Sequence, residues 1–391
     1  MTRTQTFIVF FSIVLLLYGL LNTYVFLRGL HAIPQTSQWR MWFTVVFWCI
    51  ASMYLAARLL EKFLPVTVDT FLIWGGSIWL GTMAYLIVIL LSIDILRLLN
   101  ALVPFFPSWL TGNISKAKQI TALIVAGITT LAVIASCLNA SSPRVQRLDL
   151  TIRKNSHLHS LHIAMASDIH LGTVISNSHL KKIVDAINSL NPDIVLLPGD
   201  IVDEDIAPVI RQNLGEQLKQ IHSKYGTYAV TGNHEYIGGV EAACSYLTAH
   251  GIVMLRDTSV IIDNAFVVVG REDASRRQFG GHHRKTYEEL LDGIKRTLPI
   301  ISMDHQPMHL NEAEQAGIDL QLSGHTHNGQ IWPFNYISRA VYEMSWGYLK
   351  KGNTQYYVSC GVGTWGPPMR SGNRPEIVDL RITFDEQKEG I

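Results

Sequence analysis

The residues with the clearest capacity for chemistry are carboxylate, amide and imidazole side chains that directly follow short apolar runs. Asp168 and His170 follow one such run, Asp200 follows the next, and Asn233 stands beside His234 after a third. Because ligands and catalytic groups collect at the carboxyl ends of strands in α/β sheets, we expect these clusters to converge. The candidate metal ligands are Asp168, His170, Asp200, Asn233, His305, His325 and His327.

This donor set contains oxygen and nitrogen but no sulfur, which favours manganese, iron or zinc over calcium. Seven donors exceed the needs of one tetrahedral ion. They suit two divalent ions roughly 3.5–4 Å apart with a bridging carboxylate, the arrangement used for in-line displacement at phosphorus. Extended backbone would place His325 and His327 on one side of the chain. Gly199, Gly232 and Gly324 permit tight turns and close approach beside the ions.

The elements expected to position these groups are short strands that alternate with helices. One segment, residues 179–190, has apolar residues at helical spacing. This alternation predicts an α/β sheet with helices on its faces. The predicted strands are residues 161–166, 194–197, 227–230, 266–269, 299–303 and 320–322.

The first 140 residues have a different character, because they contain only 11 of the 63 charged side chains and one of the 15 histidines. Four stretches carry no charge, and they have the length of membrane-spanning helices or approach it. We therefore predict four transmembrane helices, and an interfacial segment at 98–115 that Pro104, Pro107 and Gly112 interrupt. The uncharged stretches are Thr4–Leu27, Met41–Ala57, Thr70–Ile93 and Gln119–Pro143.

The distribution of basic residues around these stretches gives an orientation. With the N-terminus inside, seven Lys and Arg residues fall on the inner side and five on the outer side. This excess favours a cytoplasmic globular domain on a multi-pass protein of the inner (cytoplasmic) membrane. No charge lies inside a stretch, so an anchor is favoured over a transporter.

Several functional classes are disfavoured by what the sequence lacks. The 32 basic and 31 acidic residues nearly balance, which argues against nucleic-acid binding. No nucleophile-elbow or P-loop motif occurs, so acyl transfer and NTPase chemistry have no support. The four cysteines form no CxxC pair, and buried free thiols are the simplest interpretation.

The ordered blocks together resemble the signature of the calcineurin-like metallophosphoesterases, over roughly residues 145–385. The resemblance implies a four-layer α/β/β/α sandwich that carries a dinuclear site. It implies that Asp168, His170, Asp200 and His327 hold one ion. Asp200 as the bridge, with Asn233, His305 and His325, would hold the other. His234 would be the acid that protonates the leaving group.

Finer details resemble a bacterial membrane-associated branch of that family, which includes envelope phosphoesterases and UDP-2,3-diacylglucosamine pyrophosphate hydrolases. They are the segment Gly324–Gln330, Pro368-Met369-Arg370 and Pro375-Glu376-Ile377. Asn328 stands where that branch usually has Gly, and most of its members have fewer membrane helices.

Four further features have two interpretations each. Asp203 could orient a ligand or be a solvated acid, and Arg370 could grip a substrate phosphate or form a surface ion pair. The basic loop at 276–285 could meet anionic head groups or be a solvated face. The aromatic stretch Trp332–Tyr348 could pack in the core or form a membrane-facing lip that admits an acyl chain.

We therefore expect an α/β metallophosphoesterase sandwich at residues 145–391, preceded by an all-α transmembrane region at residues 1–144. Its function would be hydrolysis of a phosphoester or pyrophosphate bond in a lipid-linked or envelope substrate by metal-activated water. Its partners would be that phosphorylated substrate and membrane lipids. The alternatives are a phosphodiesterase for a soluble nucleotide-type substrate and a non-enzymatic metal-dependent membrane sensor.

Overall fold

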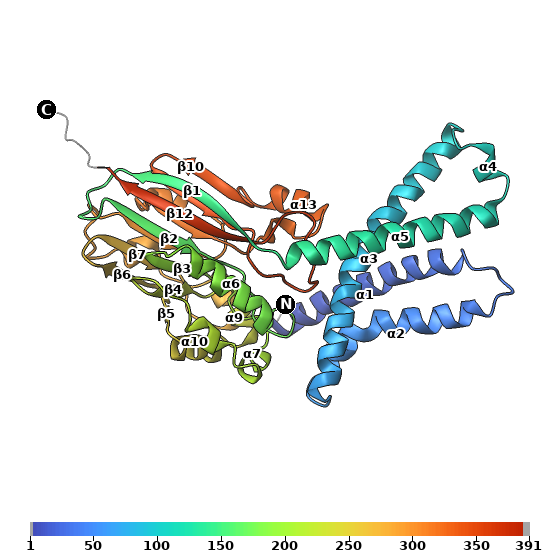
Figure 1. The fold of residues 1–391 in the computed structure, drawn as a ribbon, viewed down its shortest axis with the longest axis horizontal. Helices are drawn as coiled ribbons and strands as arrows, with labels where there is room; N and C mark the ends of the chain where they lie inside the picture. The colour runs from blue at the N-terminus through green and yellow to red at the C-terminus, as the bar shows by residue number, and fades with distance from the viewer. Residues whose placement is uncertain (1–2, 386–391) are drawn as a thin grey trace. The chain divides into compact units, whose positions relative to one another are not determined.

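The computed structural model describes residues 3–385, which divide into two compact units (Figure 1). Among the described residues, one unit comprises residues 3–136 with Gly366–Pro368, and the other comprises Cys137–Trp365 with residues 369–385. The chain passes from the last apolar helix, which ends at Ala140, into the first strand, which begins at Arg144. The predicted boundary between residues 144 and 145 falls one residue inside this strand, whereas the compact units divide between Ser136 and Cys137.

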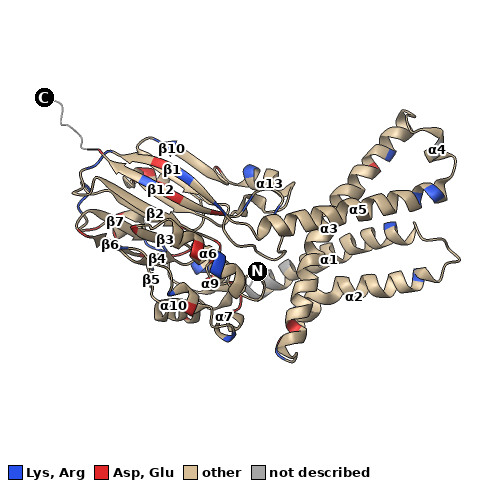
Figure 2. Cartoon of the chain, in the orientation of Figure 1, with Lys and Arg blue, Asp and Glu red and all other residues tan. Residues whose placement is uncertain are grey.

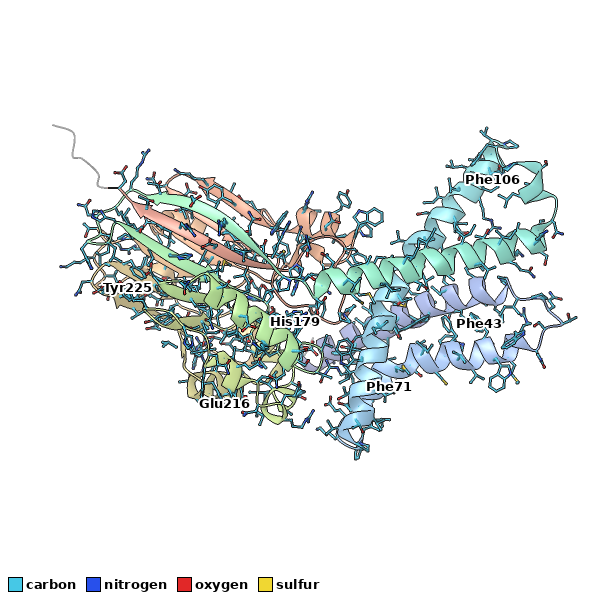
Figure 3. All side chains as sticks on the ribbon, viewed as in Figure 1. Phe43, Phe71, Phe106, His179, Glu216 and Tyr225 are labelled. Carbon is cyan, nitrogen blue, oxygen red and sulfur yellow. The ribbon has the colours of Figure 1, made fainter. Side chains whose placement is uncertain are left out.

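Within the described residues, four helices are long and apolar enough to cross a membrane. Large apolar side chains on them are exposed, among them Leu59, Phe71 and Leu123, and Figure 3 shows Phe71 on its helix. Few charged residues lie along them (Figure 2). Helices that are apolar on all sides suit lipid rather than water, so the predicted count of four is confirmed. They are α1 (Arg3–Leu30), α2 (Trp39–Leu60), α3 (Val66–Leu102) and α5 (Ile114–Ala140).

The prediction for residues 98–115 is wrong at its start. Helix α3 has 37 residues and continues to Leu102, so it is about 55 Å long against the roughly 30 Å of a bilayer core. The chain then breaks at Pro104 and Pro107, which cannot continue a helix, and forms the short helix α4 (Ser108–Thr111). Residues 98–102 therefore extend a long helix, residues 114–115 already belong to α5, and only residues 103–113 form the interrupted segment.

The second unit is built on two six-stranded sheets (Figure 1). The first has the order β1-β12-β2-β3-β4-β5 and the second β10-β11-β9-β8-β7-β6. The first sheet consists of β1 (Arg144–Ile152), β2 (Ser160–Met165), β3 (Ile194–Pro198), β4 (Thr227–Val230), β5 (Ile252–Met254) and β12 (Glu376–Phe384). The second consists of β6 (Thr258–Ile262), β7 (Phe266–Gly270), β8 (Ile300–Met303), β9 (Leu320–Ser323), β10 (Gly347–Lys351) and β11 (Thr354–Val358).

Three hydrophobic layers hold these elements together. Ile163, Val268 and Leu322 belong to the layer between the two sheets. A second layer joins the first sheet to α6 (Asn177–Ser189), α8 (Gly215–Leu218) and α10 (Val240–Ala249), and a third joins the second sheet to α11 (Tyr287–Leu290) and α12 (Asn311–Gln315). The order helix, sheet, sheet, helix confirms the predicted four-layer α/β/β/α fold. The remaining described helices are α7 (Ala207–Arg211), α9 (Asn233–Gly238), α13 (Phe334–Val341), η1 (Ala274–Phe279) and η2 (His327–Gly329).

All six predicted strands are present, each within one residue of its expected ends. The central ones form because their apolar runs are buried on both faces, as in parallel sheets. The predicted donor residues follow β2, β3, β4, β8 and β9 at the carboxyl ends of these strands, five of them in loops, Asn233 at the start of α9 and His327 at the start of η2. The sheets therefore deliver the donors to one edge of the sandwich.

Candidate metal centre

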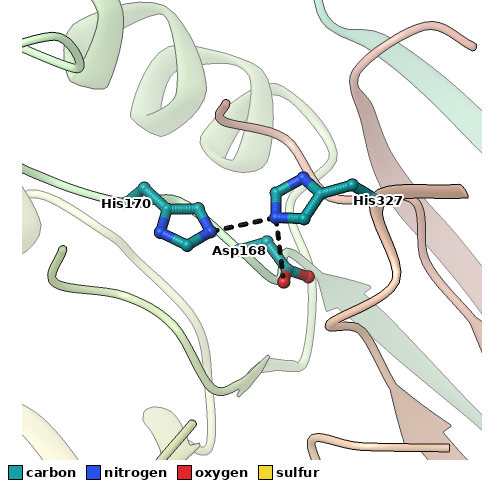
Figure 4. A group of neighbouring side chains, drawn as sticks. All are labelled: Asp168, His170 and His327. Carbon is teal, nitrogen blue, oxygen red and sulfur yellow. Dashed lines mark hydrogen bonds and ion pairs between the residues drawn. The ribbon is translucent and has the colours of Figure 1, made fainter. Parts of the chain in front are cut away.

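The first group of donors consists of Asp168, His170 and His327, all of them buried. The Nε2 atoms of His170 and His327 lie 3.0 Å apart, and Nε2 of His327 lies 3.5 Å from Oδ1 of Asp168. Figure 4 shows the two rings turned toward one another beside the carboxylate. Three donor atoms that converge within this space form a possible ligand set for one ion.

The second group contains Asp200, His305 and His325. Nε2 of His305 lies 3.1 Å from Oδ2 of Asp200. The Asn233 side-chain oxygen joins the group, because Oδ1 lies 3.3 Å from Nε2 of His305 and 2.8 Å from Nδ1 of His325. The second predicted donor set is thus also brought together.

Asp200 connects the two groups. Its Oδ2 atom, next to His305, lies 3.9 Å from Nε2 of His170 in the first group. Its Oδ1 atom accepts the backbone N–H of His234 at 2.9 Å. This placement suits a carboxylate that would contact two ions.

The backbone at the donors is unusual, because five of the seven take a positive φ that residues other than glycine rarely adopt. His325 and His327 are among them, at 71° and 46°, so the prediction of extended backbone there is wrong. The two imidazoles instead turn to different groups. Asn328 follows in the left-handed region at 44°, which Asn tolerates better than most residues, so Gly is not required.

Close approach at Gly232 confirms one prediction from the sequence. A Cβ atom there would lie 2.1 Å from Oδ1 of Asp200 and 2.5 Å from the Asp200 backbone nitrogen. Only a residue without a side chain allows the loop after β4 to meet the loop after β3.

Next to the first group lies His234, the predicted acid, with Asp203. Nδ1 of His234 is 3.1 Å from Oδ1 of Asp203, and Nδ1 of His170 is 3.6 Å from the same oxygen. Burial alone would lower the pKa of His234, but Asp203, with Asp200 and Glu204, raises it to about 9. His234 therefore keeps its proton at neutral pH. Asp203 faces two candidate site imidazoles, as the ligand-orienting interpretation expects, and is only a quarter exposed.

Arg370 occupies a different place from both of the predicted ones. Its side chain is fully buried. Its guanidinium donates to the carbonyls of Cys360 and Gly363 and lies 3.2 Å from Nδ1 of His327, and it also bonds the Asn373 side chain. Because these donors are occupied inside the fold, neither a grip on substrate nor a surface ion pair agrees with the structure. Arg370 instead fixes the backbone of residues 360–363, where Gly363 donates its N–H to the carbonyl of the candidate ligand Asp168 at 2.9 Å.

Glu235 has a structural part that sequence reasoning missed. Its buried carboxylate accepts backbone N–H groups from four residues, at 2.7–3.1 Å. They are Asp200, Ile201, Val202 and Gly232. Glu235 therefore fixes the loop of Asp200 to the start of α9. The sequence feature that could have pointed to this role is the position of Glu235 directly after Asn233 and His234.

The sequence profile described as calcineurin-like phosphoesterase matches residues 161–329. An uncharacterized metallophosphoesterase of Aquifex aeolicus is 32% identical over 241 residues, which cover 61% of this chain and 91% of that protein. The chain belongs to the calcineurin-like phosphoesterase family. The predicted family is confirmed, and the chain is a metal-dependent phosphoric ester hydrolase.

Two longer relatives match across the apolar helices as well. A transmembrane protein with metallophosphoesterase domain from Danio rerio is 29% identical over 372 residues, or 90% of this chain and 83% of that protein. An uncharacterized metallophosphoesterase of Campylobacter jejuni is 29% identical over 394 residues, or 96% and 98% of the two chains. The similarity to these two proteins therefore extends beyond residues 161–329 into the apolar helices of this chain.

The protonation of the donors in this phosphoesterase fits divalent metal ions. Burial, together with His170 and Arg370, lowers the pKa of His327, and burial with His305 lowers the pKa of His325 to about 3. Both imidazoles are neutral at pH 7, the state that binds metal ions. Burial also opposes charge on Asp200 and His305, yet their mutual attraction lowers the pKa of the first and raises that of the second. An ion beside Asp200 would displace the proton of His305.

Proposed function

We propose that this phosphoesterase is anchored in the cell membrane and hydrolyses a phosphoester or pyrophosphate bond in a lipid-linked or envelope substrate, with two divalent ions. The observation that carries the proposal is the pair of donor groups joined by Asp200, in a chain with four helices apolar enough to cross a membrane. Manganese, iron and zinc are the candidate ions.

The residues divide into roles by their positions. Asp168, His170, Asp200 and His327 would hold one ion, and Asp200, Asn233, His305 and His325 would hold the other. Bound divalent ions supply Lewis-acid stabilisation of the phosphoryl oxygens and activation of water. The chain itself supplies the acid: with Nδ1 of His234 facing Asp203, Nε2 is the nitrogen left to donate a proton to the departing oxygen.

The proposed topology is multi-pass, with the catalytic domain on the cytoplasmic side of the membrane. It is supported by the excess of basic residues on that side, seven against five. Two fusion proteins test this topology. One carries after Ile391 a reporter that is active only in the cytoplasm, and the other carries a reporter that is active only outside it. Activity of the external reporter alone would reverse the orientation.

The function is tested with the full chain in detergent, freed of metal and then supplied with manganese, iron or zinc. We expect hydrolysis of 4-nitrophenyl phosphate or its bis-ester only with added metal. A phosphorylated lipid in mixed micelles should be a better substrate than soluble nucleotides. Metal-independent hydrolysis would overturn the two-ion proposal, and preference for nucleotides would overturn the lipid assignment.

The His234→Ala variant separates binding from proton donation. We expect it to lower kcat by about 10²–10⁴-fold while its metal content stays unchanged. An exposed histidine, as in His222→Ala, provides the control. Unchanged kcat in His234→Ala would remove the proposed acid.

A further inference from the structure

An unusual apolar surface lies on α13 and the turn before it. Its members are partly or largely exposed large side chains: Trp332 at 48%, Phe334 at 41%, Tyr336 at 60%, Ile337 at 59% and Val341 at 69%. We call these five residues the aromatic face. Soluble domains seldom expose so many large apolar side chains on one short segment.

In the helix of this face, α13, the usual arrangement of an amphipathic helix on a soluble domain is reversed. The polar residues Asn335 and Ser338, three positions apart, lie on its buried and half-buried side, while Phe334, Ile337 and Val341 point outward. By contrast, α6 of the same domain buries its apolar residues and exposes Lys181 and Asp185. An apolar outward face fits a surrounding that is itself apolar.

The charge of this segment also fits a lipid surface. Between Ile331 and Tyr342 the sequence contains no acidic residue, and its one charged side chain is the exposed Arg339. Aromatic rings with an adjacent cation are the composition of helices that lie at the boundary of head groups and acyl chains.

The aromatic face lies next to the last turn of α5, the helix that leads into the domain. That turn, from Cys137 onward, belongs to the same compact unit as the face. Nδ2 of Asn139 donates to the carbonyls of Arg370 and Asn373 at 2.9 and 2.8 Å. Between those residues, Oγ of Ser371 accepts the backbone N–H of Trp332 at 3.0 Å. One short segment thus joins the end of an apolar helix to the start of the face.

The face is also close to the metal centre. The Tyr342 ring, directly after α13, lies 6.0 Å from the ring of His325. On the other side, the ring of Trp365 lies 5.8 Å from that of His234 and is 52% exposed. Gln330 exchanges two hydrogen bonds of 3.0 Å with the backbone of Trp365. Two aromatic rings, Tyr342 directly after α13 and the exposed Trp365, therefore lie beside histidines of the site.

We propose that the aromatic face is seated in the bilayer, at the boundary of head groups and acyl chains, and that the metal centre takes its substrate from this boundary. The substrate class is a phosphoric ester with a long apolar chain, whose chain lies along α13 while its phosphate reaches the donors. This inference rests on the proposed function and adds the surface that recognises the apolar part.

A fluorescent probe tests the seating without using activity. The full chain carries Ile337→Cys labelled with a nitrobenzoxadiazole dye, in a Cys49→Ser background because Cys49 is exposed. The control carries the label at Ile210, an equally exposed apolar residue of the same domain. In phosphatidylcholine vesicles, nitroxide-labelled acyl chains should quench the label at 337 and leave the label at 210 unaffected.

Two results would overturn the seating. Quenching of the 337 label by iodide in the water, as strong as at 210, would place the face in solvent. Protection from both quenchers that increases with protein density would place a second copy of the chain on the face instead of lipid.

A set of exposed-residue variants tests the substrate part. Phe334→Ser with Ile337→Ser and Val341→Ser should lower kcat/KM for a long-chain phosphate in mixed micelles by at least about tenfold. Hydrolysis of 4-nitrophenyl phosphate should stay within about twofold, as should both activities in the control Ile210→Ser with Val253→Ser. Equal loss on both substrates would overturn the inference. Absence of all hydrolysis in the unaltered chain would instead overturn the proposed function, while the probe result would still stand.

Discussion

Replacement of Arg370 by Lys is the most informative single change in the second unit. Arg370 is fully buried, and its guanidinium serves four acceptors: the carbonyls of Cys360 and Gly363, the Asn373 side chain and Nδ1 of His327. Lysine keeps the charge but offers a single nitrogen on a different stem, so it cannot reach acceptors that surround a planar group.

The magnitude follows from the acceptors that lose their donor. A buried group left without a hydrogen bond costs about 1–3 kcal/mol, and lysine can still serve one or two of the four. With two or three acceptors left without a donor, we expect Arg370→Lys to lower the free energy of unfolding by at least about 2 kcal/mol. Arg370 also donates to the carbonyl of Gly363, whose N–H bonds the Asp168 carbonyl at 2.9 Å. Loss of a group that positions a metal ligand in this way lowers metal affinity about 10–100-fold, so the affinity of the site that contains Asp168 and His327 should fall by that factor.

The assay is a competition titration of metal ions in detergent-solubilised full chain, combined with a thermal melt. Arg374→Lys is the matched control, since Arg374 lies four residues further along and is exposed. The result that refutes the reasoning is an unchanged metal affinity with a raised KM, because that pattern belongs to a substrate-binding arginine.

Three other changes test the surroundings of the centre. In Asp203→Asn the pKa of His234 should fall, because burial lowers it and the Asp203 carboxylate no longer opposes this effect. Since a proton donor is active below its pKa, the alkaline limb of the pH–rate profile should move to lower pH. An unmoved limb would show that Asp203 does not raise the pKa of the catalytic acid. Gly232→Ala should abolish metal binding and activity, since its Cβ would lie 2.1 Å from Oδ1 of Asp200, whereas Gly127→Ala, with open space around it, should retain both. In Glu235→Gln an amide nitrogen would face two of the four backbone N–H donors, so we expect the free energy of unfolding to fall by about 2–3 kcal/mol in a thermal melt. An unchanged stability would show that those donors find other acceptors.

Much of the fold could be predicted because it depends on local signals. The runs around Ile163, Leu196 and Ala229 are mostly apolar and largely buried inside a sheet, so pattern alone finds them. Strands β1 and β12 were missed because exposed residues such as Arg147 and Arg381 interrupt them. Their nine-residue parallel pairing also joins distant parts of the chain, which no local pattern reveals.

The candidate site divides in the same way. Asp168, Asp200 and His327 could be found because each follows a strand and carries a metal-binding group. The part played by Arg370 could not, because two of its acceptors are backbone carbonyls of a loop, and a carbonyl leaves no mark in the sequence. Side-chain type predicts the metal-binding residues well, whereas the residues that position them, such as Arg370, are recognised only from the contacts in the folded chain.

The measurement that tests the central claim most directly is the metal content of the full chain, determined together with its activity. After metal is removed and manganese, iron or zinc is supplied, we expect about two ions per chain and full phosphoesterase activity. The Asp200→Ala variant, which lacks the carboxylate between the two donor groups, should bind fewer ions and lose that activity. Full activity with at most one ion per chain, or in Asp200→Ala, would contradict the account.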